Sequence, residues 1–232
     1  MTLGRPRLHL RETSSTNDRA RKLAAAGAPH GTLVTAAAQS AGRGRQGRTW
    51  SAPSGHALLA SLVLRGAHPL LPLAAAVAVS ETVGPGAQIK WPNDVLVDGR
   101  KVAGILAEGR PQEGWAVLGI GVNVAVRVAD LPLELHDTAA TLGRSPADVE
   151  PFLAELLAAL ERTLALPTAE LLDAWRARDA LRGRSIAWSG GTGTAAGIDG
   201  EGRLIVELAG GGQTALDAGE VHLSRLGPEN TE

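Results

Sequence analysis

Residues 90–108 have the sequence KWPNDVLVDGRKVAGILAE. With Gln88 and Ile89 before it, this segment predicts a strand, an interruption at Trp91-Pro92-Asn93-Asp94, and a second strand that ends at Val97. Asp98-Gly99 is typical of a tight hairpin turn, whose central positions favour residues that tolerate a positive φ. The chain then returns as a strand over 102–108. We therefore expect a β-sheet with polar side chains held at the interruption.

The flanking sequence predicts more strands and several helices. Alternating or short apolar runs indicate further strands at 7–12, 32–38, 58–64 and 115–126. Apolar residues at three- and four-residue spacing indicate helices at 70–83 and 149–181, the latter interrupted by Pro167. Another helix is expected to start near Asn17, with Ser15 or Thr16 as its cap. Segment 40–55 is dense in Gly, Arg, Ser and Pro and is expected to be a loop.

The composition changes near residue 182. Residues 183–227 contain 12 of the 29 glycines, and short alternating runs are separated there by turn signals. We therefore expect an α+β fold, in which a mixed sheet with flanking helices over residues 1–181 is followed by a small β domain over 182–232.

Composition and charge exclude several classes of protein. The chain has 232 residues, no cysteine, 23 Lys+Arg and 24 Asp+Glu. The balanced charge argues against a basic nucleic-acid binder, and the lack of cysteine excludes disulfides and thiolate metal sites. No run of about 20 apolar residues and no signal peptide is evident. A cytoplasmic protein that binds neither DNA nor a membrane is expected.

Two segments have residue types suited to binding anions. Gly42-Arg43-Gly44-Arg45-Gln46-Gly47-Arg48 combines guanidinium groups with glycines that allow close approach of backbone N–H groups. Lys90, Asn93 and Asp94 flank a rigid Trp-Pro corner, where a lysine can act as a point charge on a phosphoryl oxygen. The alternatives are a solvated basic loop and a turn whose polar side chains only satisfy the backbone. A dinucleotide-binding loop is disfavoured because no helix follows the glycines.

A third segment, Gly119-Ile120-Gly121-Val122-Asn123-Val124, is interpreted as a strand whose glycines let another group approach its backbone. The alternative is a tightly packed strand. The six histidines show no spacing typical of a metal site.

Taken together, these segments resemble the biotin protein ligase family. The matching stretches are Ser15-Thr16-Asn17, QSAGRGRQGRTW at 39–50, the segment 90–108, and Gly119 to Asn123. The resemblance implies the biotin-lipoyl ligase fold, which is like that of class II aminoacyl-tRNA synthetases, with a C-terminal SH3-like β-barrel. It also implies the monofunctional type, without an N-terminal DNA-binding domain.

The resemblance implies a two-step reaction with ATP and Mg²⁺. Biotin is activated as biotinyl-5′-AMP and then transferred to a lysine of the biotin carboxyl carrier protein of acetyl-CoA carboxylase. The implied catalytic residues are Lys90, Arg43, Arg45, Asp94 and Lys101. The implied biotin-binding residues are Ser15, Thr16, Asn17, Gln39, Gly42, Arg43, Gly44, Arg45, Lys90 and Gly104. The implied ATP-binding residues are Arg43, Arg45, Arg48, Trp50, Lys90, Asn93 and Asn123, and Asp94 is a candidate metal ligand.

Because an acyl adenylate is water-sensitive, the glycine-rich loop 40–50 is expected to close over it. Family members are often dimers, so a homodimer is one expectation. The rival predictions are a lipoate or octanoate ligase or transferase of the same fold, a biotin-binding regulator without activity, and a nucleic-acid-binding module that uses the Arg-Gly loop.

Overall fold

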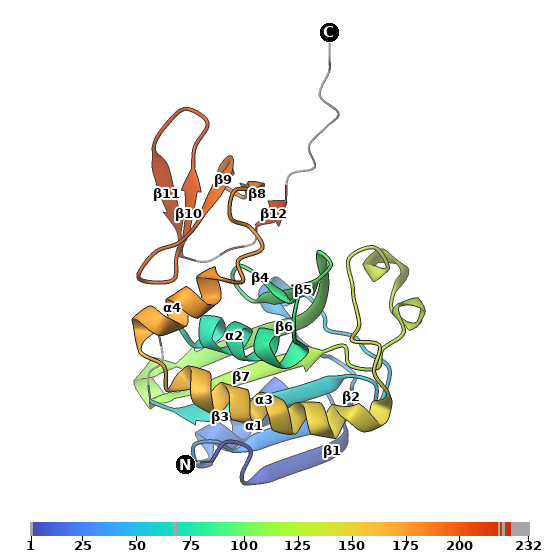
Figure 1. Cartoon of the computed structure of the whole chain (residues 1–232). Coiled ribbons are helices and arrows are strands. Elements are labelled where there is room, and N and C mark those ends of the chain that lie inside the picture. The colour runs from blue at the N-terminus through green and yellow to red at the C-terminus, as the bar shows by residue number, and fades with distance from the viewer. Residues whose placement is uncertain (1, 67–68, 218, 220, 224–232) are drawn as a thin grey trace.

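A seven-stranded mixed sheet forms the larger part of the structure, a computed structural model that describes residues 2–66, 69–217, 219 and 221–223 (Figure 1). The strand order is β1-β2-β3-β7-β6-β5-β4. Strands β1 and β2 are parallel, and every other neighbouring pair is antiparallel. The strands are β1 (Arg7–Thr13), β2 (Leu33–Gln39), β3 (Leu58–Arg65), β4 (Gln88–Lys90), β5 (Asp94–Val97), β6 (Arg100–Arg110) and β7 (Trp115–Val122). The predicted mixed sheet is confirmed.

The hairpin between β5 and β6 is confirmed. Asp98 and Gly99 at its tip have φ values of 49° and 73°, as a tight primed turn requires. By contrast, the predicted strand over 115–126 is too long, because β7 ends at Val122. Val122 pairs with Leu58, the first residue of β3, so β3 does not extend beside the residues that follow. Asn123 is therefore just beyond the sheet.

Helices cover the two faces of the large sheet unequally. The helices are α1 (Thr16–Ala25), α2 (Leu71–Val83), α3 (Val149–Leu164) and α4 (Thr168–Arg176). Helix α2 lies between the sheet and α3, and its residues 73–80 are all buried, so it has almost no polar face (Figure 1). Helix α1 packs on the opposite face through Ala20 and Ala24, against Val34 and Val63.

Two helix ends differ from the sequence prediction. Ser15 occupies the N-cap position of α1 but its hydroxyl makes no capping hydrogen bond. The first helical N–H, that of Thr16, instead donates to Gln39 Oε1 at 2.7 Å, so a side chain from β2 does the capping. Helix α4 ends at Arg176 rather than near 181, because the next residues pair with β4. Ile89 N donates to Arg178 O at 2.7 Å, and Ala180 N donates to Ile89 O at 2.9 Å.

The C-terminal residues form a separate antiparallel sheet in the order β11-β10-β9-β8-β12. Its strands are β8 (Ser185–Trp188), β9 (Gly191–Ile198), β10 (Leu204–Glu207), β11 (Gln213–Leu216) and β12 (His222–Leu223). Within the described residues β11 and β12 are its two edges, so strand pairing does not close it into a barrel. Trp91 Nε1 donates to Gly202 O at 3.1 Å and joins this sheet to the corner after β4.

None of the helices in the described ranges is both long enough and apolar enough to cross a membrane.

Asp179, in the segment that joins α4 to β8, makes stability depend on pH. Its Oδ1 accepts a hydrogen bond from Leu181 N at 2.8 Å, whereas Oδ2 is buried without a hydrogen-bond partner. Burial raises the pKa of this carboxyl, and the backbone hydrogen bonds and the charge of Arg182 offset the shift only in part. Because the folded-state pKa exceeds the unfolded one, the folded state binds more protons. Stability therefore falls as pH rises through the interval between the two values.

We predict that Asp179→Asn raises the melting temperature at neutral pH, above that interval, because the amide carries no buried charge. The difference should shrink toward zero at about pH 4, near the pKa of an unfolded aspartate. Thermal unfolding at both pH values tests this, with the exposed Asp217→Asn as the control. A lower melting temperature for Asp179→Asn at neutral pH would contradict it.

Candidate active site

A cavity of about 620 Å³ opens on the face of the large sheet that α2 and α3 leave uncovered. This volume is typical of small-molecule sites. Its walls come from the start of α1, the loop after β2, the corner 90–94, the segment 131–139 and residues 221–223 of the C-terminal part. The sequence-predicted site residues that line it are Ser15, Thr16, Asn17, Gln39, Arg43, Gly44, Arg45, Arg48, Trp50, Lys90, Asn93, Asp94, Lys101, Gly104 and Asn123. Gly42 is the exception.

Three glycines form the floor of the cavity. Gly104 of β6 pairs with Gly121 of β7, and Gly119 lies two residues earlier on the same face of β7. A Cβ added at Gly121 would lie 2.6 Å from Trp50 Cε2, and one at Gly104 would lie 3.1 Å from Trp50 Cζ3. A Cβ at Gly119 would overlap Asn17 Oδ1. The predicted close approach to this strand is confirmed: the indole lies on two of the glycines and the Asn17 amide on the third.

A chain of hydrogen bonds orients the Asn17 amide. Ser61 Oγ lies 2.8 Å from Thr16 Oγ1 and 2.6 Å from Asn17 Oδ1. Asn17 Nδ2 donates to Glu108 Oε2 at 2.8 Å. A carboxylate can only accept, so the NH₂ group must face Glu108, and Oδ1 must accept from the Ser61 hydroxyl. Gln39 Oε1 lies 3.0 Å from Thr16 Oγ1, whose single proton can go either to it or to Ser61 Oγ.

The loop after β2 is a small hairpin, which we call the arginine hairpin (residues 42–50). Trp50 N donates to Gly42 O at 3.0 Å, and Gly44 N donates to Arg48 O at 2.7 Å. At its tip Gln46 and Gly47 have φ values of 54° and 76°. Gly42 does not line the cavity, but a Cβ there would overlap Trp50 O. Gly42 therefore lets the two arms of the hairpin meet.

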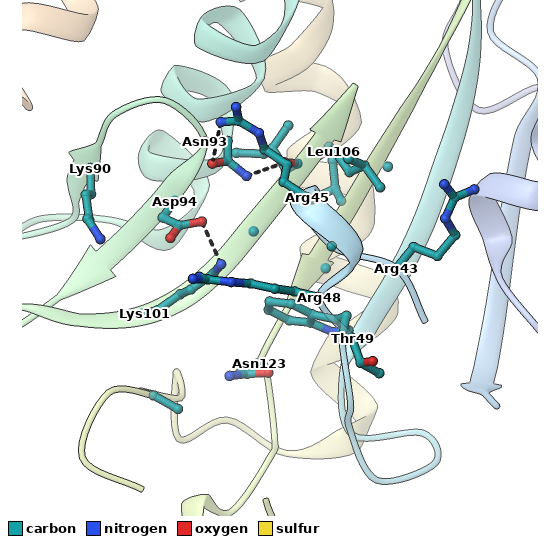
Figure 2. Close-up of a pocket in the computed structure, with 18 of the residues that line it drawn as sticks. Arg43, Arg45, Arg48, Thr49, Lys90, Asn93, Asp94, Lys101, Leu106 and Asn123 are labelled. Carbon is teal, nitrogen blue, oxygen red and sulfur yellow. Dashed lines mark hydrogen bonds and ion pairs between the residues drawn. The ribbon is translucent and has the colours of Figure 1, made fainter. Parts of the chain in front are cut away.

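The three arginines of the hairpin point in two directions. Arg43 lines the cavity, but its guanidinium turns away from the other two and contacts Asp18 Oδ1 at 2.8 Å and Glu108 Oε1 at 3.1 Å (Figure 2). The Asp18 carboxylate raises the pKa of the Arg43 guanidinium above its ordinary value, so the group stays charged. Arg45 and Arg48 extend toward the corner after β4 (Figure 2).

Asn93 joins that corner to both β6 and the arginine hairpin. Its main-chain O accepts from Ile105 N at 2.9 Å, and its Nδ2 donates to Ile105 O at 2.7 Å. The amide orientation is thereby set, and Asn93 Oδ1 accepts from Arg45 Nη1 at 3.3 Å. The Trp-Pro corner is therefore anchored at its polar end rather than held by a turn alone.

A β-bulge places Lys101 in the cavity. Val95 pairs with Ala103 and Leu96 with Lys101, so Val102 is an extra residue in β6. Val102 is fully buried in the core. The side chain of Lys101 lies over Gly104 on the cavity face, with Cε 3.1 Å from the position of a Cβ there. Its Nζ forms an ion pair with Asp94 Oδ1 at 2.6 Å.

Asn123 lines the cavity and has one buried acceptor without a partner. Its Nδ2 donates to Ala140 O at 3.0 Å, so the amide orientation is set. The remaining Oδ1 is buried and has no hydrogen-bond partner, as is also true of Trp50 Nε1. An unsatisfied buried acceptor favours a ligand with an N–H group at this position.

The cavity therefore has two chemically different ends. Neutral polar groups and a fixed amide stand at the Asn17 end. At the other end, the cationic side chains of Arg45, Arg48, Lys90 and Lys101 outnumber the two carboxylates that line the cavity, those of Asp94 and Asp137. An excess of positive charge in a recessed site stabilises phosphate or carboxylate groups and the charge that develops when they react.

The described residues contain no metal site built from several protein groups. Asp94 is already paired with Lys101, and among the described residues no three His, Asp or Glu side chains are grouped to hold an ion.

Sequence reasoning missed several residues around the cavity. Ser61 is fully buried and carries no local signal, because a lone serine in an apolar strand is unremarkable until α1 packs on it. Asp18 lies at the predicted helix start, and Glu108 is the last residue of the segment 90–108. The sequence shows that both residues are acidic, but their pairing with Arg43 depends on tertiary structure.

Comparisons with known proteins identify the family of this chain. A family described as "Biotin/lipoate A/B protein ligase family" matches residues 10–124, and "Biotin protein ligase C terminal domain" matches residues 188–224. The chain is 38% identical to the biotin–[acetyl-CoA-carboxylase] ligase of Paracoccus denitrificans, over 91% of this chain and 98% of that protein.

Two further relatives match different shares of this chain and of their own length. The bifunctional ligase/repressor of Bacillus subtilis is 43% identical over 58% of this chain, and the matched region spans only 45% of that protein. The structure of an Aquifex aeolicus biotin protein ligase in complex with biotin and ATP has a TM-score of 0.80 and 27% identity. That similarity covers 95% of this chain and 99% of the other.

We predict that Gly119→Ala destabilises the fold by about 1–3 kcal/mol, because the new methyl group displaces the Asn17 amide from its hydrogen bonds. Adding Asn17→Ala should cancel part of this loss, since the two substitutions share one contact. Urea unfolding measures both. Gly200→Ala is the control, because nothing lies within 4 Å of a Cβ there. Additive effects of Gly119→Ala and Asn17→Ala would contradict the contact.

Proposed function

Because this chain belongs to the biotin protein ligases of the biotin/lipoate A/B protein ligase family, we propose that it joins biotin to a carrier protein at the expense of ATP. The observation that carries the proposal is one cavity with a neutral polar end and a cationic end over the same two glycine-bearing strands. Biotin and ATP have these two kinds of group, a polar ring system and a chain of phosphates.

In the first step, a carboxylate oxygen of biotin attacks the α-phosphorus of ATP. The bond from that phosphorus to the bridging oxygen breaks, and pyrophosphate leaves with the electron pair. Both reactants are anions, so positive charge fixed in advance lowers the barrier. Lys90, Arg45, Arg48 and Lys101 supply that charge in our proposal. Mg²⁺ enters only as the counter-ion of the ATP phosphates.

In the second step, the amine of the carrier lysine attacks the acyl carbon of the adenylate, and AMP leaves. The amine must first lose a proton, and in our proposal the Asp94 carboxylate accepts it. Asp94 is positioned for a role here, because its carboxylate faces the cavity and is bound to the ammonium of Lys101 at 2.6 Å. The carrier lysine, on approaching Asp94, would contact the carboxylate that Lys101 contacts in this structure.

The neutral end suits the biotin ring system. Its ureido group has both donors and an acceptor, and the Asn17, Thr16 and Gln39 side chains offer both kinds of group. The fixed Asn17 amide discriminates between ligands better than a rotating one, because its donor and acceptor cannot exchange places.

The other end suits adenine. Trp50 offers a flat face on which a purine can stack. Asn123 Oδ1 is the buried acceptor without a partner, and the exocyclic amine of adenine is a donor that would satisfy it. Guanine has a carbonyl at that position and would leave the acceptor unpaired.

The partner and the domain boundary are part of the proposal. The Paracoccus relative is named for ligating biotin to acetyl-CoA carboxylase, so the biotin carboxyl carrier protein of that enzyme is the proposed acceptor. We assign residues 1–181 to the catalytic domain and 182–232 to a small domain whose described residues Val221, His222 and Leu223 line one edge of the cavity.

Mass spectrometry after incubation with Mg-ATP and an equal mixture of biotin, lipoate and octanoate tests the proposal. Biotinyl-adenylate should be the only adenylate formed. A lipoyl or octanoyl adenylate would mean that the assignment of the neutral end to biotin is wrong. If no adenylate formed with any acid, the ligase proposal would fail.

We predict that Asn123→Ala raises the KM for ATP by up to about tenfold, the worth of one hydrogen bond, and weakens the preference for ATP over GTP. Initial rates of adenylate formation with each nucleotide measure both. Thr141→Val is the matched control, because its hydroxyl lies 3.2 Å from Asn123 O, and its loss leaves Oδ1 in place. Unchanged nucleotide preference in Asn123→Ala would refute the role of Oδ1.

A further inference from the structure

Four charged side chains beside the cavity form a closed ring of alternating sign. Arg43 contacts Asp18 at 2.8 Å and Glu108 at 3.1 Å. Arg21 contacts the same two carboxylates, that of Glu108 at 3.2 Å and that of Asp18 at 2.5 Å. Two guanidinium groups and two carboxylates make the ring neutral, so Arg43 adds no net charge to the phosphate-binding end of the cavity.

The ring joins three separate parts of the structure. Asp18 and Arg21 lie one turn apart on α1, Glu108 lies on β6, and Arg43 is near the start of the arginine hairpin. Glu108 uses its two oxygens differently. Oε1 contacts both guanidinium groups, while Oε2 accepts from the Asn17 amide that lies on the cavity floor. One carboxylate is therefore shared by the hairpin and the neutral end of the cavity.

The exposure of the ring makes its contacts reversible. The four side chains retain between 21% and 39% of their accessible surface. Ion pairs this exposed are weak and are screened by salt. Such contacts can hold a hairpin in place for a time and still release it, which a buried pair would not do.

We propose that Asp18 and Glu108 form a catch for Arg43 that holds the arginine hairpin closed over the cavity. Arg43 is then a positioning residue, whose guanidinium fastens the hairpin, while Arg45 and Arg48 face the ligand. The consequence for catalysis rests on the proposed function: a closed hairpin retains the acyl adenylate until the carrier arrives.

The ring contains its own control. Asp18→Asn or Glu108→Gln removes one of the two carboxylates that hold Arg43. Arg21→Gln removes the competing guanidinium and leaves both carboxylates to Arg43. The carboxylate variants should therefore loosen the hairpin, whereas Arg21→Gln should not. If the cluster only stabilised the fold, all three variants would have similar effects.

Limited trypsin digestion of the ligand-free protein tests the catch, because trypsin cleaves after Arg43, Arg45 and Arg48. Cleavage in the hairpin should speed up by about two- to fivefold in Asp18→Asn and in Glu108→Gln, as loss of a partly exposed ion pair implies. It should not speed up in Arg21→Gln. Added salt should accelerate cleavage of the unmodified protein more than that of Asp18→Asn.

Urea unfolding of the same variants separates local opening from global unfolding. The catch is overturned if hairpin cleavage is unchanged in both carboxylate variants, or if Arg21→Gln accelerates it equally. It is also overturned if the faster cleavage is matched by an equal loss of global stability.

A second readout is the rate at which the adenylate leaves the protein, followed by rapid dilution of the preformed complex. Asp18→Asn should release it about two- to fivefold faster, and Arg21→Gln should not. An unchanged release rate in Asp18→Asn would overturn the catalytic consequence of the catch. If no adenylate forms at all, the proposed function fails, whereas the digestion result still decides whether the catch exists.

Discussion

The bare backbone of Gly104, Gly119 and Gly121 is the constraint on which the site depends. Strands β6 and β7 pair through the middle of the sheet, yet at these positions they have no side chain on the cavity face. Flat groups can therefore lie directly on the peptide planes, as Asn17 and Trp50 do. A side chain at any of these positions would place at least a methyl group on the floor of the cavity. It would displace the groups that a ligand must contact.

The polar groups around this floor are held from outside the cavity. Glu108 and Ser61 orient Asn17, and Ile105 orients Asn93. The Asn123 amide is set by Ala140. In each of these side chains, hydrogen bonds within the protein set which amide atom is the donor and which is the acceptor. Preorganisation of this kind reduces the ordering cost of binding, which suits a site that must bring two anions together.

The sequence predicted those parts of the site that depend on local pattern. Asp98-Gly99 forms the expected turn, and the glycines at 119 and 121 do admit other groups. Features that depend on packing were missed or wrong. No local signal marks Val102 as a bulge, although the bulge turns Lys101 into the cavity. Capping by Ser15 was wrong because Gln39, from β2, takes the first N–H of the helix.

Calorimetric titration of biotin and of a non-hydrolysable ATP analogue into Gly119→Ala and Gly121→Ala tests the central claim most directly. The two glycines are two residues apart on one face of β7, but Asn17 lies on one and Trp50 on the other. We predict that Gly119→Ala mainly weakens biotin binding and that Gly121→Ala mainly weakens binding of the nucleotide. If both variants lost the two ligands equally, or if the pattern were reversed, the assignment of the two ends of the cavity would be wrong.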